Sequence, residues 1–428
     1  MSSSVQFYLA IFIFLMTYAG IMSEKIHRTI CALAGGGAMI YFGLVTQEQA
    51  ITEFIDFNTL GLLTGMMILI SVVKQSGFFQ VLALWALKKS KGSPRELLIL
   101  LSIVTAVGAA LIDSVTAALL IAPMTISLCR MLRMSPVPIL ISEILMCNIG
   151  GTALMIGNPP NVMIGSATHL DFNDFLMNLA PVVFITVIVI LIAVLLIFEK
   201  DFRSVRLSEE EGETSDIKSI FSRSLMVLAL TVLGFVVHSR FGLESATVAM
   251  TGGMAALLFC GINPEDALKE VDLDTLMFFM GLFILVGGME NAGVITAIAE
   301  KGIEMVDGDS HLITFLILLL SGVASAFVDN IPFTATMIPL IQDMQSLMNL
   351  PHADYMWWAL ATGACFGGNG TMIGASVLRR QRYYDWCFTE CDHGGYRGKR
   401  RVQYQLYRFY EMVLSSDASV SFCGRVLP

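Results

Sequence analysis

The chain has 428 residues, of which 55% are hydrophobic and 14% are charged, and its mean hydropathy is +0.73. A soluble globular domain has more charge and less apolar surface than this, so the composition excludes that class and indicates an integral membrane protein. The formal net charge of −9 gives no reason to expect a nucleic-acid partner, because in a membrane protein the position of the charges matters more than their sum.

Apolar runs long enough to cross a hydrocarbon core of ~30 Å recur along the chain. The first run lacks a basic flank and is followed by Glu24, Lys25 and His27 instead of a small-residue cleavage site, so we interpret it as a retained span and not as a signal peptide. The sequence predicts an all-α, multi-pass protein in the lipid bilayer of the plasma (inner) membrane. The apolar runs lie near 5–21, 29–45, 59–73, 177–198, 246–262 and 311–328.

The chain contains two related halves. Residues 56–69, DFNTLGLLTGMMIL, match residues 272–285, DLDTLMFFMGLFIL, at an offset of 216. The same offset pairs Asp113 with Asp329, and an offset of 217 pairs GGTALMIG with GGNGTMIG. A register that holds over this length indicates an internal duplication. The predicted units are a first transmembrane repeat at 1–198, a cytoplasmic linker at 199–223, a second repeat at 224–376 and an atypical basic tail at 377–428.

The positions of Lys and Arg predict that the two repeats have opposite orientations in the membrane. With the N-terminus outside, nearly all basic residues before the tail, Arg28 among them, face the cytoplasm, and only Arg240 and Lys301 lie outside. Each repeat must then contain a re-entrant hairpin, so the fold is expected to be a pair of inverted-topology repeats. The hairpins are 97–112 with 114–128, entering from the cytoplasm, and 311–328 with 333–348, entering from outside.

Polar, broken backbone is tolerated at membrane depth only where protein or a water-filled cavity surrounds it. The hairpin tips, LIDSVTAALL and FVDNIPFTAT, fit this description, and so do the Gly-rich segments at 150–161 and 367–376, which predict unwound transmembrane helices. Free N–H ends of half-helices attract anions, and free carbonyl ends attract cations. The predicted substrate- and ion-binding residues are Asp113, Ser114, Thr116, Asn148, Thr152, Gly157, Asn158, Pro159, Asn161, Asp329, Asn330, Thr334, Asn369, Thr371, Gly374 and Ser376.

Three acidic residues lie within apolar segments. An ionisable residue there costs at least ~2.5 kcal/mol unless it is paired or hydrated, so Asp113 and Asp329 are predicted sites for Na⁺ or a proton. The alternative is that each aspartate only caps the half-helix that follows it. Glu143 either faces the cavity or lies near the cytoplasmic end of its segment.

The sequence also bears on catalytic, cofactor and metal sites and on the choice of substrate. No HExxH, GxSxG or Walker pattern occurs, so the sequence predicts neither an enzyme nor a cofactor. Five cysteines in or beside apolar runs have no paired spacing and are expected to serve in packing, while Cys387, Cys391 and His393 lack a fourth ligand for a metal site. Neither hairpin tip contains Lys or Arg, so the tips leave arsenite, chloride, dicarboxylate and phosphate all open as substrates.

DFNTLGLLTGMMIL, FVDNIPFTAT and GGNGTMIGAS resemble the ion transporter superfamily of arsenite permeases, sodium/proton antiporters, citrate-type carriers and the melanosomal P protein, with the P protein branch the most similar. The resemblance covers about 1–376. It implies two hairpins and two unwound helices around a central substrate site, coupling ions at the tips, and a homodimer. Carried over to this chain, the ion sites are Asp113 to Thr116 with Asn158 to Asn161, and Asp329 to Thr334 with Asn369 to Ser376.

These features together predict a secondary active transporter that moves a small ion by alternating access. The expected substrate is an inorganic or carboxylate anion, and the expected coupling ion is Na⁺ or H⁺. The tips read Asp-Ser in the first half and Asp-Asn in the second, so the two ion sites are expected to be unequal. A sodium/proton antiporter and a passive anion channel are the alternatives.

The tail departs from the repeat. After Ser376 the repeat predicts an apolar continuation and a last span, but residues 377–428 instead hold nine of the chain's 26 basic residues. A cytoplasmic tail that binds anionic lipid is one explanation. We favour a shifted reading frame or a truncated gene, because the break falls inside a motif, and such a copy would be inactive.

Overall fold

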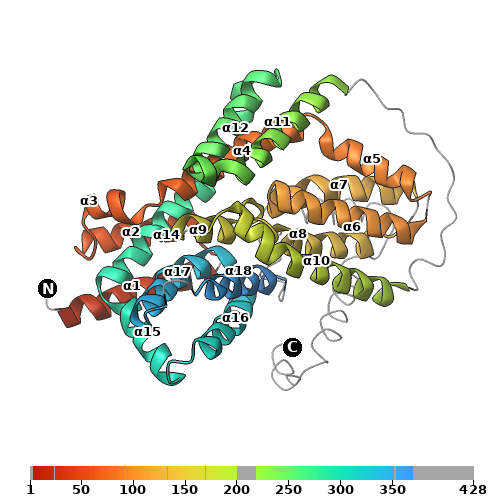
Figure 1. Ribbon diagram of the computed structural model, residues 1–428. Coiled ribbons are helices and arrows are strands. Elements are labelled where there is room, and N and C mark those ends of the chain that lie inside the picture. Colours follow the sequence, from red (N-terminus) through yellow and green to blue (C-terminus); the bar gives the residue numbers. More distant parts are fainter. Residues whose placement is uncertain are drawn as a thin grey trace.

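The structure is a computed structural model. It describes residues 3–23, 25–91, 93–132, 134–168, 170–199, 218–350 and 353–369. Within these ranges every regular element is a helix, so the all-α prediction is confirmed (Figure 1). The sequence positions beyond Asn369, including the basic tail with Cys387, Cys391 and His393, lie outside the described residues.

The helices of the first half begin with two long apolar segments and end with the longest helix of the molecule. They are α1 (Ser3–Ser23), α2 (Arg28–Tyr41), α3 (Gln47–Gln49) with the π-helical turn η1 (Ala50–Phe54), α4 (Phe57–Gln75), α5 (Phe78–Lys89), α6 (Pro94–Leu111), α7 (Ser114–Met131), α8 (Val137–Gly151), the 3₁₀ turn η2 (Met155–Gly157), α9 (Pro159–Ala167) and α10 (Phe172–Ile197).

The second half repeats this order as far as it is described. Its elements are α11 (Lys218–Val237), η4 (His238–Phe241), α12 (Ser245–Phe259), α13 (Pro264–Lys269), α14 (Leu273–Asn291), α15 (Val294–Met305), α16 (Ser310–Phe327), α17 (Asn330–Leu347) and α18 (Tyr355–Gly367). Because α11 begins at Lys218, its first turn is formed by residues that we expected in the linker.

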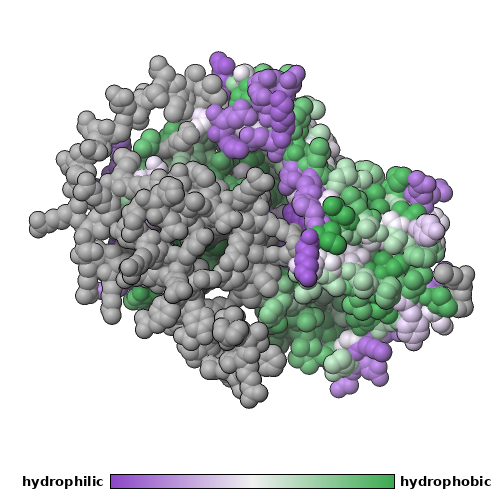
Figure 2. Space-filling view, turned by 180° about the vertical axis from the view of Figure 1, so that it is seen from behind, coloured by the Kyte–Doolittle hydropathy of each residue, from purple (hydrophilic) through white to green (hydrophobic). Residues whose placement is uncertain are grey.

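Seven of the described helices are long and apolar enough to cross a membrane: α1, α4, α6, α10, α11, α14 and α16. Many of their apolar side chains point outwards. On α10, for example, Phe184 is 66% exposed and Leu196 is 69% exposed, and hydrophobic side chains cover much of the surface that is visible in colour in Figure 2. Such a surface is stable against lipid tails and not against water.

Equivalent helices of the two halves make equivalent contacts, and two of these contacts exchange partners between the halves. Helix α2 packs against α14 and α12 packs against α4, whereas α6 packs against α8 and α16 against α18 within their own halves. These contacts match the offset found in the sequence. The opposite orientation of the two halves stays a prediction.

Glycines allow the exchanged helices to approach closely. A Cβ atom on Gly65 of α4 would lie 2.4 Å from the backbone of Ala249 in α12, and one on Gly281 of α14 would lie 2.6 Å from the backbone of Ala32 in α2. In lipid the hydrophobic effect does not hold helices together. Close van der Waals packing does so instead, and small residues at the crossing permit it. The match DFNTLGLLTGMMIL with DLDTLMFFMGLFIL therefore preserves the glycine that each crossing needs.

We expect Gly65→Ala to destabilise the protein by roughly 1–3 kcal/mol, because the new methyl group would overlap with backbone that cannot rotate away. The measurement is the melting temperature of the purified protein in detergent. Gly37→Ala on α2 is the matched control, because a Cβ atom there meets nothing within 4 Å. Equal melting temperatures for the two variants would contradict this account of the crossing.

Both predicted hairpins and the first predicted unwound helix are present. The hairpins are α6 with α7 and α16 with α17, and each turns at an aspartate. The segment at 150–161 is interrupted as predicted, since α8 ends at Gly151 and α9 begins only at Pro159, with a single 3₁₀ turn between them. In the second half α18 ends at Gly367, and the chain after Asn369 lies outside the described residues.

Candidate functional site

The tip of the first hairpin is fixed by Asp113. Its Oδ2 atom accepts hydrogen bonds from the backbone N–H of Thr116 at 2.9 Å and from the hydroxyl of the same residue at 3.0 Å. This is the geometry of a helix N-cap, so the capping role that we considered as an alternative is real. It uses the oxygen that a cation at this tip would also need.

The break in the first unwound helix is held open by close backbone contacts and one buried amide. A Cβ atom on Gly157 would lie 2.4 Å from the carbonyl oxygen of Gly151, so position 157 requires glycine. The side-chain amide of Asn161, which is fully buried, donates to the carbonyl oxygens of Thr152 at 2.9 Å and of Leu154 at 3.0 Å. The amide thus satisfies backbone groups that the interrupted helix leaves unpaired.

The start of α9 differs from our expectation of free N–H groups. Proline has no backbone N–H, and Pro159 and Pro160 occupy the first two positions of this helix. The next N–H group, that of Asn161, donates to the carbonyl oxygen of Asn158 at 3.0 Å. An anion bound here would therefore depend on side-chain donors and on the helix dipole, and not on exposed backbone N–H groups.

A continuous set of hydrogen bonds joins the first tip to the interruption after α8 and to Asn369 at the end of α18. The hydroxyl of Ser114 donates to Oδ1 of Asn158, and the amide of Asn158 donates to the carbonyl oxygen of Asn148 at 3.3 Å. The amide of Asn148 then donates to Oδ1 of Asn369 at 2.8 Å. We call these four residues, Ser114, Asn148, Asn158 and Asn369, the amide cluster. The structure thus brings residues of both halves together, as predicted.

Thr152 lies beside the amide cluster and Gly368 leaves room for it. The hydroxyl of Thr152 donates to the carbonyl oxygen of Asn148 at 2.8 Å, and a Cβ atom on Gly368 would lie 3.6 Å from the amide nitrogen of Asn148. Neutral amide and hydroxyl groups of this kind can bind a small ion that has lost part of its hydration shell. Thr371, Gly374 and Ser376, which we also predicted for this site, lie outside the described residues.

The tip of the second hairpin has a cationic partner. Oδ2 of Asp329 accepts a hydrogen bond from the guanidinium group of Arg28 at 3.1 Å, and both side chains are 17% exposed. Oδ1 of Asp329 accepts from the N–H of Ile331 at 3.4 Å, which caps α17. Arg28 also donates to Thr275 at 3.3 Å and lies over the ring of Phe278. The two hairpin tips are thus unequal, as expected. The difference comes from Arg28, which belongs to α2 and to neither tip.

Two further predicted residues belong to the second hairpin. Thr334 is fully buried, and its hydroxyl has no hydrogen-bond partner among the residues that the structure describes. Asn330 forms the first residue of α17 beside the Asp329 cap. The neighbouring turn is held to the first half by Tyr18 of α1, whose hydroxyl donates to the carbonyl oxygen of Pro332 at 2.6 Å.

Sequence reasoning missed the roles of Arg28 and Tyr18. We used Arg28 only to orient the chain, and the internal repeat gave no hint, because the residue at the offset of 216 from Arg28 is Glu244. Glu244 instead bonds Asn58 at 3.2 Å. The only indication in the sequence of a role for Arg28 was its place at the very start of an apolar helix.

The family model described as "Citrate transporter" matches residues 18–363, which include the first hairpin, the first unwound helix and the second hairpin. The chain belongs to this citrate transporter family. It is therefore a transporter and an integral, multi-pass membrane protein, and the resemblance to the ion transporter superfamily is confirmed.

Curated relatives and a solved transporter structure are similar to this chain. An uncharacterized transporter of Mycobacterium tuberculosis is 38% identical over 381 residues, which is 86% of this chain and 88% of the relative. The human P protein is 31% identical over 87% of this chain, which spans only 56% of that protein. The crystal structure of the YdaH transporter of Alcanivorax borkumensis shares the fold, with a TM-score of 0.62 at 12% identity, covering 97% of this chain and 96% of that chain.

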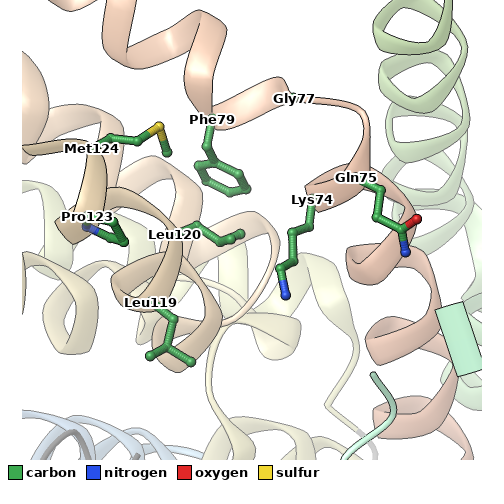
Figure 3. A pocket seen from close by; sticks show the side chains of 8 residues that line it. All are labelled: Lys74, Gln75, Gly77, Phe79, Leu119, Leu120, Pro123 and Met124. Carbon is green, nitrogen blue, oxygen red and sulfur yellow. The ribbon is translucent and has the colours of Figure 1, made fainter. Parts of the chain in front are cut away.

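A pocket of about 390 Å³ separates the first hairpin of this citrate transporter family member from α4 and α5 (Figure 3). Leu120, Pro123 and Met124 of α7 line one side, and Phe79 of α5 lies opposite. Lys74 also lines the pocket and pairs with Glu270 at 2.9 Å. Its walls are mainly apolar, so we assign it to the boundary between the hairpin and its neighbours and not to the ion-binding site.

Proposed function

We propose that this protein is a secondary active transporter of a citrate-like carboxylate anion, driven by an Na⁺ or H⁺ gradient across the plasma (inner) membrane. The amide cluster is the observation that supports the proposal. It joins neutral hydrogen-bond groups of the first hairpin tip and the interrupted helix to Asn369 of the second half. Transporters that work by alternating access bind their substrate at the interface between their repeats, and this cluster is such an interface.

The test is uptake of radiolabelled citrate by proteoliposomes that contain the full chain, with imposed Na⁺ or pH gradients. We expect accumulation above the external concentration when one gradient is present and equilibration when both are absent. Vesicle pH that changes with Na⁺ alone would favour a sodium/proton antiporter. Currents that reverse at the Nernst potential of one anion without coupling would favour a passive channel. Failure to move citrate in the intact, correctly inserted protein would overturn the substrate proposal.

A further inference from the structure

Glu143 lies in the interior of the first-half bundle. It belongs to α8, which packs against α6, α7 and α10, and only 2% of its surface is exposed. The structure thus buries Glu143 among protein side chains. It lies five residues before Asn148 of the amide cluster, which is about 7 Å along the helix axis.

One carboxyl oxygen of Glu143 has a partner and the other has none. Oε1 forms a short hydrogen bond with the hydroxyl of Thr125 on α7, whereas Oε2 is buried without a hydrogen-bond partner among the described residues. A buried carboxylate without a cation is costly enough that the group takes up a proton instead. Burial and the unpaired Oε2 atom therefore favour the neutral acid at Glu143.

The charged and titratable groups around Glu143 do not change this conclusion. On α8 itself the nearest is the thiol of Cys147, one turn further on, and α7 adds Cys129 and, at its start, Asp113. Helix α6 has Arg95 and Glu96 in its exposed first turn, where Arg95 pairs with Glu199. Helix α10 has Asp174 in its first turn, and α18 has Tyr355 and Cys365. The side chain of Arg130 lies outside the described part of α7. No described group supplies a positive charge to Glu143.

The second half shows that helix packing does not require an acid at this place. The offset of 216 pairs Thr125 with Ile341, and the offset of 217 pairs Glu143 with Leu360. Both Ile341 and Leu360 are fully buried, and their helices, α17 and α18, pack against each other. The same helix pair is therefore built with two apolar residues in one half and with a hydrogen-bonded carboxyl group in the other.

We propose that Glu143, with Thr125 as its hydrogen-bond partner, is the proton-binding site through which this transporter couples substrate movement to a proton gradient. The proposal rests on the proposed transport function and names its coupling ion. At the tips Asp329 is paired with Arg28 and Asp113 caps α7 through Oδ2, whereas Glu143 is a buried carboxyl group with no described cation and no capping role. A proton adds to the carboxylate in one conformation and leaves it in another, in which water reaches the site.

A route for that proton starts at the pocket beside α7. Met124 lines the pocket, and Thr125, the next residue, contacts Glu143. The pocket thus comes within one residue of the proposed site along α7. A small movement of the first hairpin against α4 and α5 would admit water to it.

Infrared spectroscopy of the full chain in lipid nanodiscs tests the proton site without any substrate. We expect a carboxylic-acid C=O band that shifts in heavy water and is lost in Glu143→Gln. Glu290→Gln, which changes an exposed acid at the end of α14, is the matched control and keeps the band. Identical spectra for wild type and Glu143→Gln would overturn the proposal.

Citrate uptake by proteoliposomes tests the coupling. We expect Glu143→Gln to lower accumulation driven by a pH gradient at least tenfold more than it lowers citrate-for-citrate exchange. Thr125→Ile combined with Glu143→Leu, which copies the second-half pair, should do the same with normal stability. An equal loss of both activities would overturn the coupling role. If the wild type moves no citrate, the proposed substrate fails, while the infrared result still decides the proton site.

Discussion

Asp329→Asn is expected to lower gradient-driven citrate uptake at least tenfold while leaving membrane insertion normal. The substitution leaves the guanidinium group of Arg28 partly buried and unpaired next to Thr275. A hydrogen bond between charged groups contributes about 1.5–3 kcal/mol, which corresponds to a shift of roughly 10–100-fold between two conformations. The pair joins α2 to a hairpin that alternating access has to move, so its loss changes the balance between conformations.

The double variant Arg28→Met/Asp329→Asn distinguishes the loss of the ion pair from the cost of leaving one charge unpaired. We expect each single substitution to lower the melting temperature and the double substitution to restore most of it, because no charge is then left unpaired. The measurements are melting temperature in detergent and citrate uptake in proteoliposomes. Lys301→Met, which removes an exposed basic residue of α15, is the control. Undiminished uptake by Asp329→Asn would refute the role of this ion pair.

Local pattern predicted many of the helices and one interruption. Apolar length predicted the spans α1, α4, α10 and α16, whereas the runs at 29–45 and 246–262 form the shorter helices α2 and α12, and α11 and α14 are not among the predicted runs. The aspartates inside apolar runs predicted the hairpin turns at Asp113 and Asp329, because a chain in lipid must satisfy its own backbone. The glycines and prolines at 150–161 predicted the break between α8 and α9 for the same reason. The repeat added the correspondence between halves, which the contacts of α2 with α14 and of α12 with α4 reproduce.

The partners of the site residues were not predictable in the same way. Arg28 and Asp329 are far apart in the sequence, and their contact depends on how α2 packs against α14, which no local pattern specifies. The hydrogen bond between Asn148 and Asn369 likewise depends on how α8 packs against the end of α18. At α9 the error was chemical: Pro159 and Pro160 remove the N–H groups that we expected to attract an anion.

Asn158→Ala is expected to cause the largest loss of function in the amide cluster. Asn158 is 2% exposed and uses both ends of its amide, accepting from Ser114 and donating to the carbonyl oxygen of Asn148. Alanine would leave the buried hydroxyl of Ser114 without its partner, whereas the carbonyl oxygen of Asn148 would keep the hydroxyl of Thr152. We therefore expect a loss of stability of roughly 1–3 kcal/mol and a loss of citrate uptake of at least 100-fold. Melting temperature and uptake rate measure the two effects.

Asn178→Ala is the matched control, because this exposed asparagine donates only within its own helix, to the carbonyl oxygen of Asp174. A double-mutant cycle with Ser114→Ala then tests the contact itself. Residues that share a hydrogen bond are coupled by about 0.5–3 kcal/mol, so the double variant should lose less stability than the two single variants together. Strict additivity would mean that the first hairpin tip and the interrupted helix act independently, and a transport site shared between them would then be untenable.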